Sequence, residues 1–307
     1  YNPNDGDLYY AGFLIRGKVK EDCDAGFIYQ NTLTKEYDSF IRITSQRSGQ
    51  PGVNSKEYAT FRLNIPCKDE QEKISKILNC LDELFTLHQR KLEKLKLNKS
   101  ALLQKLFPQN GCTIPEVRFK GFTDAWEQRK FSDLYEKISE KNDLSYSLDK
   151  IISVANMYYK SDAKVSNEEY LRTYNIFRYG EIAFEGNKSK EFTYGRFVEN
   201  TIGDGIISHV FEVFRPITKY DIYFWKYYIN YEPIMGKVLS RCTKKTTMMT
   251  NLVAKDFLKE TVFVPSLAEQ KRIGILLNTL DKSITLHQRK LDHLQLQKKA
   301  LLQQMFV

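Results

Sequence analysis

The sequence predicts a mixed α+β fold in which two globular regions are each followed by one long helix. Three observations support this prediction. A 42-residue segment occurs twice, its apolar residues recur every seven positions, and the remaining chain alternates short apolar runs with turns containing glycine and proline. The 19 tyrosines and 19 phenylalanines among the 307 residues supply enough large side chains for sizeable cores.

The duplicated segment runs from Pro66 to Phe107 and again from Pro265 to Phe306. The two copies align without gaps at an offset of 199 residues (265 − 66), and 23 of the 42 aligned positions are identical. Such agreement indicates an internal repeat, so the two copies should fold alike.

Each copy carries two rows of mainly apolar residues spaced by seven, which is the pattern of a coiled-coil seam. No proline or glycine interrupts residues 74–106, and at about 1.5 Å per residue this stretch predicts a helical rod of about 50 Å. Because one copy alone has nothing to bury its seam, we expect the copies to pair about a pseudo-two-fold axis, either parallel or antiparallel. The residues expected in the seam are Ile74, Leu81, Phe85, His88, Leu92, Leu95 and Leu102 in the first copy, and Ile273, Leu280, Ile284, His287, Leu291, Leu294 and Leu301 in the second.

Polar residues also occupy matched seam positions, His88 with His287 and Lys99 with Lys298. A polar seam residue costs stability and can fix register and orientation. The alternative is a loose seam in which these side chains reach water. A metal site formed by the two histidines is disfavoured, because no cysteine or carboxylate stands beside them at ligand spacing.

Ahead of the first long helix, turn residues and apolar alternation predict a strand, a helix, a polar loop and a short strand, at residues 9–19, 27–41, 42–58 and 61–66. Residues 108–115 read as a linker. The second globular region is expected to contain a strand at 151–159, a strand at 180–186, strands with a Gly-Asp-Gly hairpin within 195–216, helices at 219–231, 232–240 and 253–260, a basic, threonine-rich loop at 240–251, and a closing strand at 261–265.

The same order of helix, polar loop, helical turn, strand and proline precedes both long helices. We therefore divide the chain into residues 1–66, the end of a first globular domain; 67–113, the first long helix with its linker; 114–264, a second globular domain; and 265–307, the second long helix. If the second unit begins at Ile114, its equivalent would begin 199 residues earlier, at −85. About 85 residues of the first domain are thus expected to be absent from this sequence.

Composition narrows the classes of function. The net charge of +9 favours an anionic partner, and the five scattered cysteines are typical of a reducing cytoplasm. No apolar run approaches the roughly 20 residues of a membrane helix. There is no glycine-rich phosphate loop, no His-Glu-x-x-His motif and no pair of cysteines at zinc spacing. Three of the four histidines lie in the long helices, and the fourth, His209, is interpreted as a sheet residue rather than a general base. We therefore predict no catalytic residue, metal site or cofactor in this chain.

Three loops combine cations with hydroxyl or amide groups, which can contact phosphates and base edges. A solvated charged turn is the alternative for each loop taken singly. Two of the loops fall at equivalent places in the two units, which favours nucleic-acid contact. The candidate residues are Arg42, Arg47, Ser48, Gln50 and Lys56 in the first domain, Lys188, Lys190, Tyr194 and Arg196 in the second, and Arg241, Thr243, Lys244, Lys245, Thr246 and Thr247 in the threonine-rich loop.

The duplicated helix also carries a family resemblance. A globular domain ending in a strand and proline, followed by xEQxxI…LD…LHQRKLxxLxLxKxALLQxxF, occurs twice, and RFKGFTDAWEQRKFSDL (residues 118–134) stands between the domains. In these features the chain resembles the specificity subunits of type I restriction–modification systems over essentially its whole length. It departs from that pattern at the front of the first domain.

The resemblance implies that the two long helices form an antiparallel coiled coil with a target-recognition domain at each end, the first one partial. Each domain would read one half of a split sequence in double-stranded DNA. The rod would set the spacer, since half-sites about one helical turn, roughly 34 Å, apart suit its length. The partners implied are two methyltransferase subunits, which bring S-adenosylmethionine, and restriction subunits. The surface that they cover would include Leu87, Leu97, Leu103, Leu286, Leu296 and Leu302, unless these leucines belong to a wide internal stripe.

Two other functions remain open from the sequence. One is a coiled-coil scaffold whose globular ends bind protein. The other is an enzyme whose catalytic part lies in the absent front. Steep salt dependence of DNA binding would separate a DNA-reading subunit from a protein scaffold.

Overall fold

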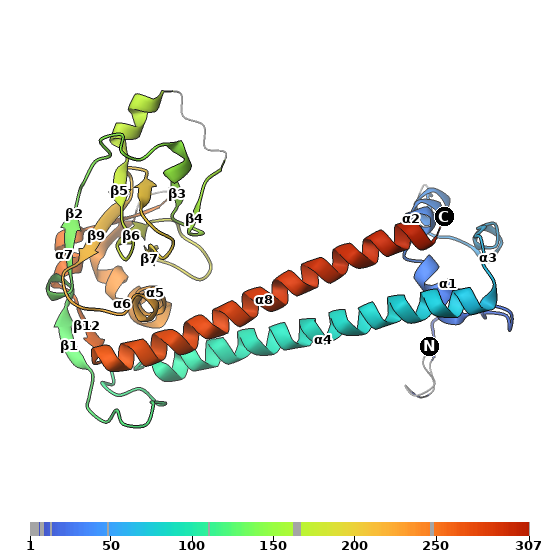
Figure 1. The fold of residues 1–307 in the computed structure, drawn as a ribbon, viewed down its shortest axis with the longest axis horizontal. Helices are drawn as coiled ribbons and strands as arrows, with labels where there is room; N and C mark the ends of the chain where they lie inside the picture. Colours follow the sequence, from blue (N-terminus) through green and yellow to red (C-terminus); the bar gives the residue numbers. More distant parts are fainter. Residues whose placement is uncertain are drawn as a thin grey trace. The chain divides into compact units, whose positions relative to one another are not determined.

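A computed structural model describes residues 6, 9–12, 14–47, 49–109, 111–161, 167–245 and 249–306. The chain divides into two compact units (Figure 1). Unit 1 comprises residues 1–94 and 284–307, and unit 2 comprises residues 95–283. Each unit contains one half of each long helix, so each is described separately. No helix among the described residues is both long and apolar enough to cross a membrane.

The two copies of the repeat form the helices α4 (Lys68–Leu106) and α8 (Leu267–Met305), each of 39 residues. The helices run antiparallel. In unit 1, Asp82 pairs with Lys298 and His88 faces His287, so the residue number falls along one helix as it rises along the other. In unit 2, Lys99 pairs with Asp281 in the same sense.

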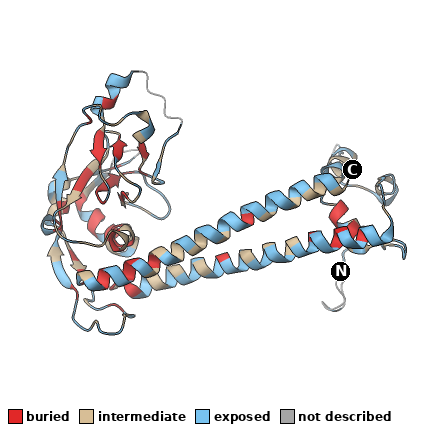
Figure 2. Ribbon diagram, in the orientation of Figure 1, coloured by how far each residue is buried: buried red, intermediate tan, exposed pale blue. Residues whose placement is uncertain are grey.

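Burial along α4 and α8 follows the heptad rows (Figure 2). Each of the fourteen residues expected in the seam is buried or partly buried, and Leu78 and Leu277 of the same rows are inaccessible to solvent. The leucines outside the rows divide into two groups. Leu103 and Leu302 pack against the cores, whereas the exposed ones are Leu87, Leu97, Leu286 and Leu296.

Unit 1 adds three short helices to its half of the helix pair: α1 (Ala25–Asn31), α2 (Lys35–Thr44) and α3 (Ser55–Tyr58). Its core joins Phe27 to Ile74 and Leu78, with the Phe306 ring stacked on Phe27 at 4.9 Å. The expected single helix at 27–41 is in fact two, because Thr34 interrupts it. The Thr34 hydroxyl accepts the amide hydrogen of Tyr37 and so caps the start of α2.

Three further expectations for unit 1 are wrong. The polar loop expected at 42–58 is shorter, since α2 extends into it and α3 closes it. The described residues of 9–19 and of 61–66 contain no strand. An apolar run becomes a strand only when it pairs with another strand, and no strand among the described residues pairs with these two runs.

Unit 2 is built around a four-stranded antiparallel sheet in the order β2-β9-β6-β7. Four two-stranded ladders, β1–β12, β3–β4, β5–β8 and β10–β11, complete its described strands. The strands are β1 (Glu127–Lys130), β2 (Tyr135–Ile138), β3 (Ile152–Ser153), β4 (Tyr158–Tyr159), β5 (Asn175–Phe177), β6 (Ile182–Glu185), β7 (Arg196–Glu199), β8 (Gly205–Ile207), β9 (Glu212–Pro216), β10 (Thr243–Lys245), β11 (Thr250–Leu252) and β12 (Thr261–Val264).

Helices α5 (Ile222–Tyr228), α6 (Glu232–Cys242) and α7 (Ala254–Lys259) share one aromatic core with this sheet. In that core Phe257 contacts Phe197 and Phe214 of the sheet, while Phe224 contacts Phe107 at the end of α4. The helices expected at 219–231, 232–240 and 253–260 and the strands expected at 180–186 and 261–265 are confirmed, with shifted ends.

The sequence misplaced three features of unit 2. The strand expected at 151–159 is a hairpin, β3–β4, which turns where Met157 adopts a φ of 51°. The hairpin expected within 195–216 is absent, because β7, β8 and β9 pair with other strands rather than with one another. His209, interpreted as a sheet residue, is exposed in the turn between β8 and β9.

The ends of the helix pair are held in the same way in the two units. In unit 1, the Gln71 side chain accepts the amide hydrogen of Asp24 and donates to the carbonyl of Pro66. In unit 2, Gln270 makes the same two bonds to Asp221 and to Pro265. Each aspartate caps the following helix, α1 or α5. The internal repeat therefore extends into α1 and α5, where the sequences differ.

A second matched contact uses the polar seam lysines. Lys99 Nζ lies 2.6 Å from Asp281 Oδ1, and the Tyr227 hydroxyl donates to Oδ2 of the same carboxylate at 2.6 Å. In unit 1, Lys298 Nζ lies 2.6 Å from Asp82 Oδ1, and Gln30 donates to that carboxylate. The lysines are thus paired rather than loose, and each carboxylate ties both long helices to a short helix of its unit.

The His88–His287 contact should make unit 1 less stable in acid. The two Nδ1 atoms lie 2.8 Å apart, and partial burial together with positive charge from His88, Lys290 and Lys91 lowers the pKa of His287. An unfolded histidine titrates near pH 6.5, so below about pH 6.5 the unfolded chain takes up a proton that the folded chain resists. Stability is therefore retained above that pH and is lost as the pH falls through it.

We expect the melting temperature to fall between pH 7.5 and pH 5.5 more steeply in the native chain than in a His88→Leu, His287→Leu double variant. Differential scanning calorimetry at several pH values measures both slopes. Equal slopes would show that the His88–His287 pair does not contribute to the pH dependence of stability.

Candidate nucleic-acid interface

Two of the predicted cationic loops lie against each other in unit 2. The Thr250 amide donates to the carbonyl of Gly186 at 2.9 Å, the Thr250 hydroxyl donates to the same oxygen, and Asn187 forms a bridge with Met249. The loop of residues 186–195 is thereby joined to the hairpin β10–β11. We refer to these two segments together as the cationic loop pair.

Glycine at two positions allows this close approach. A Cβ on Gly186 would lie 2.1 Å from the carbonyl oxygen of Thr250, a distance that no side chain tolerates. Gly195 has a φ of +78°, and a Cβ there would lie 2.6 Å from the carbonyl oxygen of Glu185. A larger residue at Gly186 would separate the two segments, and one at Gly195 would disturb the end of the loop against β6.

The predicted residues of the first segment differ in how exposed their side chains are and in whether those side chains already have a partner. Lys190 is exposed, with no ion pair among the described residues. Arg196 is occupied, since its Nε donates to Glu185 Oε2 at 2.7 Å and its Nη2 to the carbonyl of Ala155 at 2.8 Å. Tyr194 is partly buried against the core, and Lys188 is exposed.

The second segment is a hairpin rather than the expected open loop. Lys244 projects from β10 and is exposed, without an ion pair in the described part of the chain. Arg241 is held by Glu260 through hydrogen bonds from Nε and Nη2, and Thr243 donates to the carbonyl of Leu239 at 2.6 Å. The side chain of Lys245, together with Thr246 and Thr247, lies outside the described residues.

The equivalent loop in unit 1 follows α2 and precedes α3, as the β10–β11 hairpin follows α6 and precedes α7. Within it, Arg47 forms a two-bond ion pair with Glu57. The hydrogen bond from the Asn54 backbone amide, followed by the bonds from Arg47, lowers the pKa of the Glu57 carboxyl. The remaining described candidates are exposed: Arg42, Gln50 and Lys56. Ser48 lies outside the described residues.

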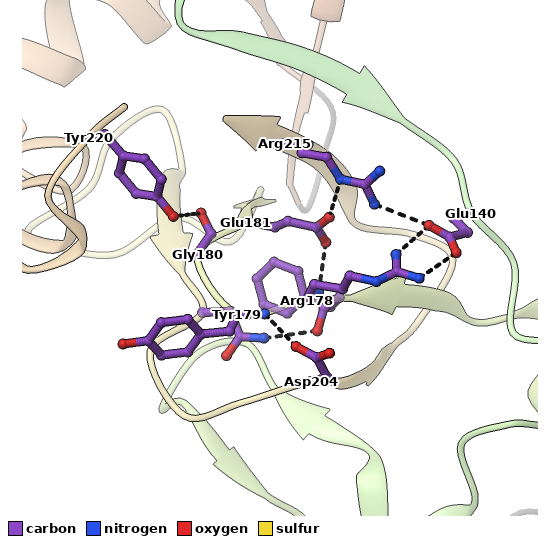
Figure 3. A network of polar contacts seen from close by, with 10 residues as sticks. Glu140, Arg178, Tyr179, Gly180, Glu181, Asp204, Arg215 and Tyr220 are labelled. Carbon is purple, nitrogen blue, oxygen red and sulfur yellow. Dashed lines mark hydrogen bonds and ion pairs between the residues drawn. The ribbon is translucent and has the colours of Figure 1, made fainter. Parts of the chain in front are cut away.

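An ion-pair network that the sequence did not predict stabilises the sheet of unit 2 (Figure 3). Arg178 donates to both oxygens of Glu140, and Arg215 bridges Glu140 to the buried Glu181, with its Nε 2.8 Å from Glu181 Oε1. These arginines, Arg178 first, lower the pKa of Glu140 to about 2. The network also holds the turn at Gly180, whose carbonyl accepts the Tyr220 hydroxyl at 3.1 Å. It connects β2, β9 and the turn between β5 and β6, so it is a structural support.

The occupied arginines show what sequence reasoning missed. Arg196 and Arg241 look free in the sequence because their partners, Glu185 and Glu260, lie 11 and 19 residues away. A possible signal is that Glu185 ends the apolar run of β6, where an unpaired carboxylate would be costly. The described residues contain no cluster of three or more His, Cys, Asp or Glu able to hold a metal ion.

The fold and site thus define a chain with an antiparallel helix pair built from an internal repeat and with cationic loops on its globular part. The family described as type I restriction modification DNA specificity domain matches residues 1–97 and 123–296. The chain belongs to this family of type I restriction–modification specificity subunits.

Individual relatives are more distant. The specificity subunit of the type I restriction enzyme MjaVIII from Methanocaldococcus jannaschii is 27% identical over 92 residues, which are 30% of this chain and 20% of that protein. The S subunit structure from M. genitalium aligns with a TM-score of 0.60 and 15% identity, covering 93% of this chain and 73% of that one. The HsdS structure from Thermoanaerobacter tengcongensis gives a TM-score of 0.50 at 16% identity, covering 93% and 70%. At these identities the two structures indicate a shared fold.

Proposed function

We propose that this chain reads a split DNA sequence on behalf of a type I restriction–modification complex and performs no catalysis itself. The observation that carries the DNA contact is the cationic loop pair of unit 2, which presents Lys190 and Lys244 from two segments joined at Gly186 and Thr250. Lysines of this kind neutralise phosphates, and neighbouring amide and hydroxyl groups can read base edges. The corresponding loop of unit 1, residues 45–54, would contact the other half of the target.

The occupied arginines take other roles in this proposal. Arg196 and Arg241 hold the two segments in shape through Glu185 and Glu260, so they position the loops rather than contact DNA directly. While the exposed lysines neutralise phosphates, base reading falls to the remaining polar residues of the loops. Arg42, Gln50 and Lys56 would serve this purpose in unit 1.

We further propose that α4 and α8 set the spacing between the half-sites and carry the partner subunits. The exposed leucines Leu87, Leu97, Leu286 and Leu296 lie outside the seam, where they are available to another protein. The partners would be two methyltransferase subunits, which supply S-adenosylmethionine, together with restriction subunits. The chain would act with them on DNA in the cytoplasm.

The DNA contact can be tested with a Lys190→Glu, Lys244→Glu double variant in complex with the methyltransferase partner. The target sequence is first found by mapping methylated sites in cells that carry both proteins. Because two phosphate contacts are lost and two repulsive charges are added, we expect affinity to fall at least about tenfold and the slope of log affinity against log salt to decrease by about 2. Fluorescence anisotropy between about 50 and 200 mM salt measures both quantities.

The matched control is a Lys120→Glu, Lys219→Glu double variant. It makes the same change in net charge at exposed lysines outside the cationic loop pair, so it should retain most of the affinity. Equal losses in the two variants would mean that only net charge matters. If neither variant weakened binding and the salt dependence were flat, a protein scaffold would become the better interpretation.

A further inference from the structure

The hairpin β10–β11 turns one face toward the core of unit 2 and the other toward solvent. Its cross-strand pairs are Thr243 with Leu252, Lys244 with Asn251, and Lys245 with Thr250. Side chains alternate between the two faces of such a ribbon. Thr250 is 2% exposed and bonded to Gly186, and Leu252 packs against the aromatic core. Lys244 and Asn251 are both exposed, so this middle pair stands on the outer face.

The backbone beneath this outer face is fixed at the base of the hairpin and along β11. At the base, the Val253 amide donates to the carbonyl of Cys242 at 2.8 Å. Along β11, the amide and the hydroxyl of Thr250 both donate to the carbonyl of Gly186. A side chain that reads a DNA base has to be held in a set geometry by the backbone that carries it. The middle pair of the hairpin meets this condition.

Two asparagines belong to the cationic loop pair, Asn187 and Asn251. An asparagine amide can read a base directly, because it places a hydrogen-bond donor beside an acceptor. The Nδ2 atom of Asn187 lies 3.4 Å from Glu185 Oε1, so its donor group is turned toward the protein. The side chain of Asn251 is exposed and forms no hydrogen bond to another described residue. Asn251 therefore presents a complete amide on the outer face.

Adenine is the base that matches such an amide. Its major-groove edge carries the N7 acceptor beside the N6 donor, so one asparagine can make both hydrogen bonds. The major groove is also wide enough to admit a two-stranded β-ribbon. Side chains directly opposite on a ribbon have Cβ atoms about 4.5–5.5 Å apart. Lys244 can therefore reach a phosphate at the edge of the groove while Asn251 reaches a base within it.

We propose, on the basis of the function proposed above, that Asn251 determines specificity for one A·T base pair in the half of the target that unit 2 reads. The hairpin β10–β11 lies in the major groove, where the Asn251 amide donates to adenine N7 and accepts from adenine N6. Lys244 neutralises a neighbouring phosphate. Asn251 thus supplies sequence discrimination, whereas Lys244 supplies affinity that does not depend on sequence.

The test is an Asn251→Ala variant in complex with the methyltransferase partner. Fluorescence anisotropy compares its affinity for the mapped target with its affinity for duplexes in which each base pair is changed in turn. We expect the preference at one A·T position to fall at least about fivefold, because both bonds to adenine are lost. Preferences at the other positions should persist. The slope of log affinity against log salt should equal that of the native complex, because no phosphate contact is removed.

Two further variants serve as controls. Asn251→Gln keeps an amide on the outer face and should retain the preference for adenine, since glutamine makes the same pair of bonds. Asn98→Ala removes another exposed amide of unit 2, on α4, and should leave every preference unchanged. Asn251 is exposed in its strand, so its replacement does not disturb the core.

Unchanged preferences in Asn251→Ala would overturn the role of Asn251. The proposed function would stand in that case if the Lys190→Glu, Lys244→Glu double variant still weakened binding. An equal loss of affinity for all duplexes would identify a contact that reads no base, and a relaxed G·C position would exclude adenine. Either result contradicts the proposal. If the native complex itself showed no sequence preference, the proposed function and the role of Asn251 would both be wrong.

Discussion

Replacing Phe224 with alanine is expected to lower the free energy of unfolding of unit 2 by about 3–5 kcal/mol, the usual cost of deleting a fully buried phenylalanine ring. Phe224 is inaccessible to solvent. Its ring meets Phe107 directly after α4, Trp126 directly before β1 and Tyr228 from its own helix. Removing the ring would therefore leave a cavity at the place where these segments, which are distant in sequence, pack together.

Urea unfolding followed by tryptophan fluorescence measures this loss, because both tryptophans, Trp126 and Trp225, belong to unit 2. Tyr170→Ala is the control in the same unit. Tyr170 is 47% exposed, so its removal should cost less than about 1 kcal/mol. Phe27→Ala, the equivalent change in unit 1, should leave the tryptophan transition nearly unshifted. A loss below about 1 kcal/mol for Phe224→Ala would show that the aromatic core does not hold these segments together.

Exchanging residues 114–264 for the corresponding domain of another specificity subunit should change one half of the methylated sequence and leave the other half as it was. The structure favours such an exchange, because β1 and β12 are antiparallel partners and bring the two ends of the domain together. The donor domain needs an arginine and a tryptophan at the places of Arg118 and Trp126. Without the arginine, Glu269, which is 1% exposed, would be left as an unpaired buried charge.

Sequencing of methylated DNA from cells that carry the hybrid and its methyltransferase partner gives the result directly. The native chain under the same conditions supplies the reference sequence. A hybrid with both halves altered would contradict separate recognition by the two units. Loss of all methylation in a hybrid that still co-purifies with the partner would also contradict separate recognition.

Much of the fold followed from local pattern. The heptad rows predicted both long helices, and the structure extends each to 39 residues. Alternation and turn residues also located β6, β12 and the helices around Phe224 and Phe257. These elements satisfy their own backbone hydrogen bonds or have an unambiguous buried face, so a short window of sequence contains the needed information.

The failures have a common physical cause. Residues 61–66 and 9–19 have strand-like patterns, but a strand exists only through its partner, and the partner is not part of the pattern. The helix expected at 27–41 broke at Thr34 because a side-chain cap competed with helix continuation. In the candidate interface, the sequence also did not show that Arg47, Arg196 and Arg241 are each paired with a glutamate in the folded chain.

The amino-acid sequence by itself determined the internal repeat, the seam of α4 and α8 and the cationic character of the loops, because periodicity and composition are properties of the chain. The tertiary structure alone decided which loops meet and which cations remain exposed. Gly186 and Thr250 are 64 residues apart, and Arg241 and Glu260 are 19 residues apart. Such contacts depend on backbone groups and on charges brought together over long separations, and no local pattern encodes them.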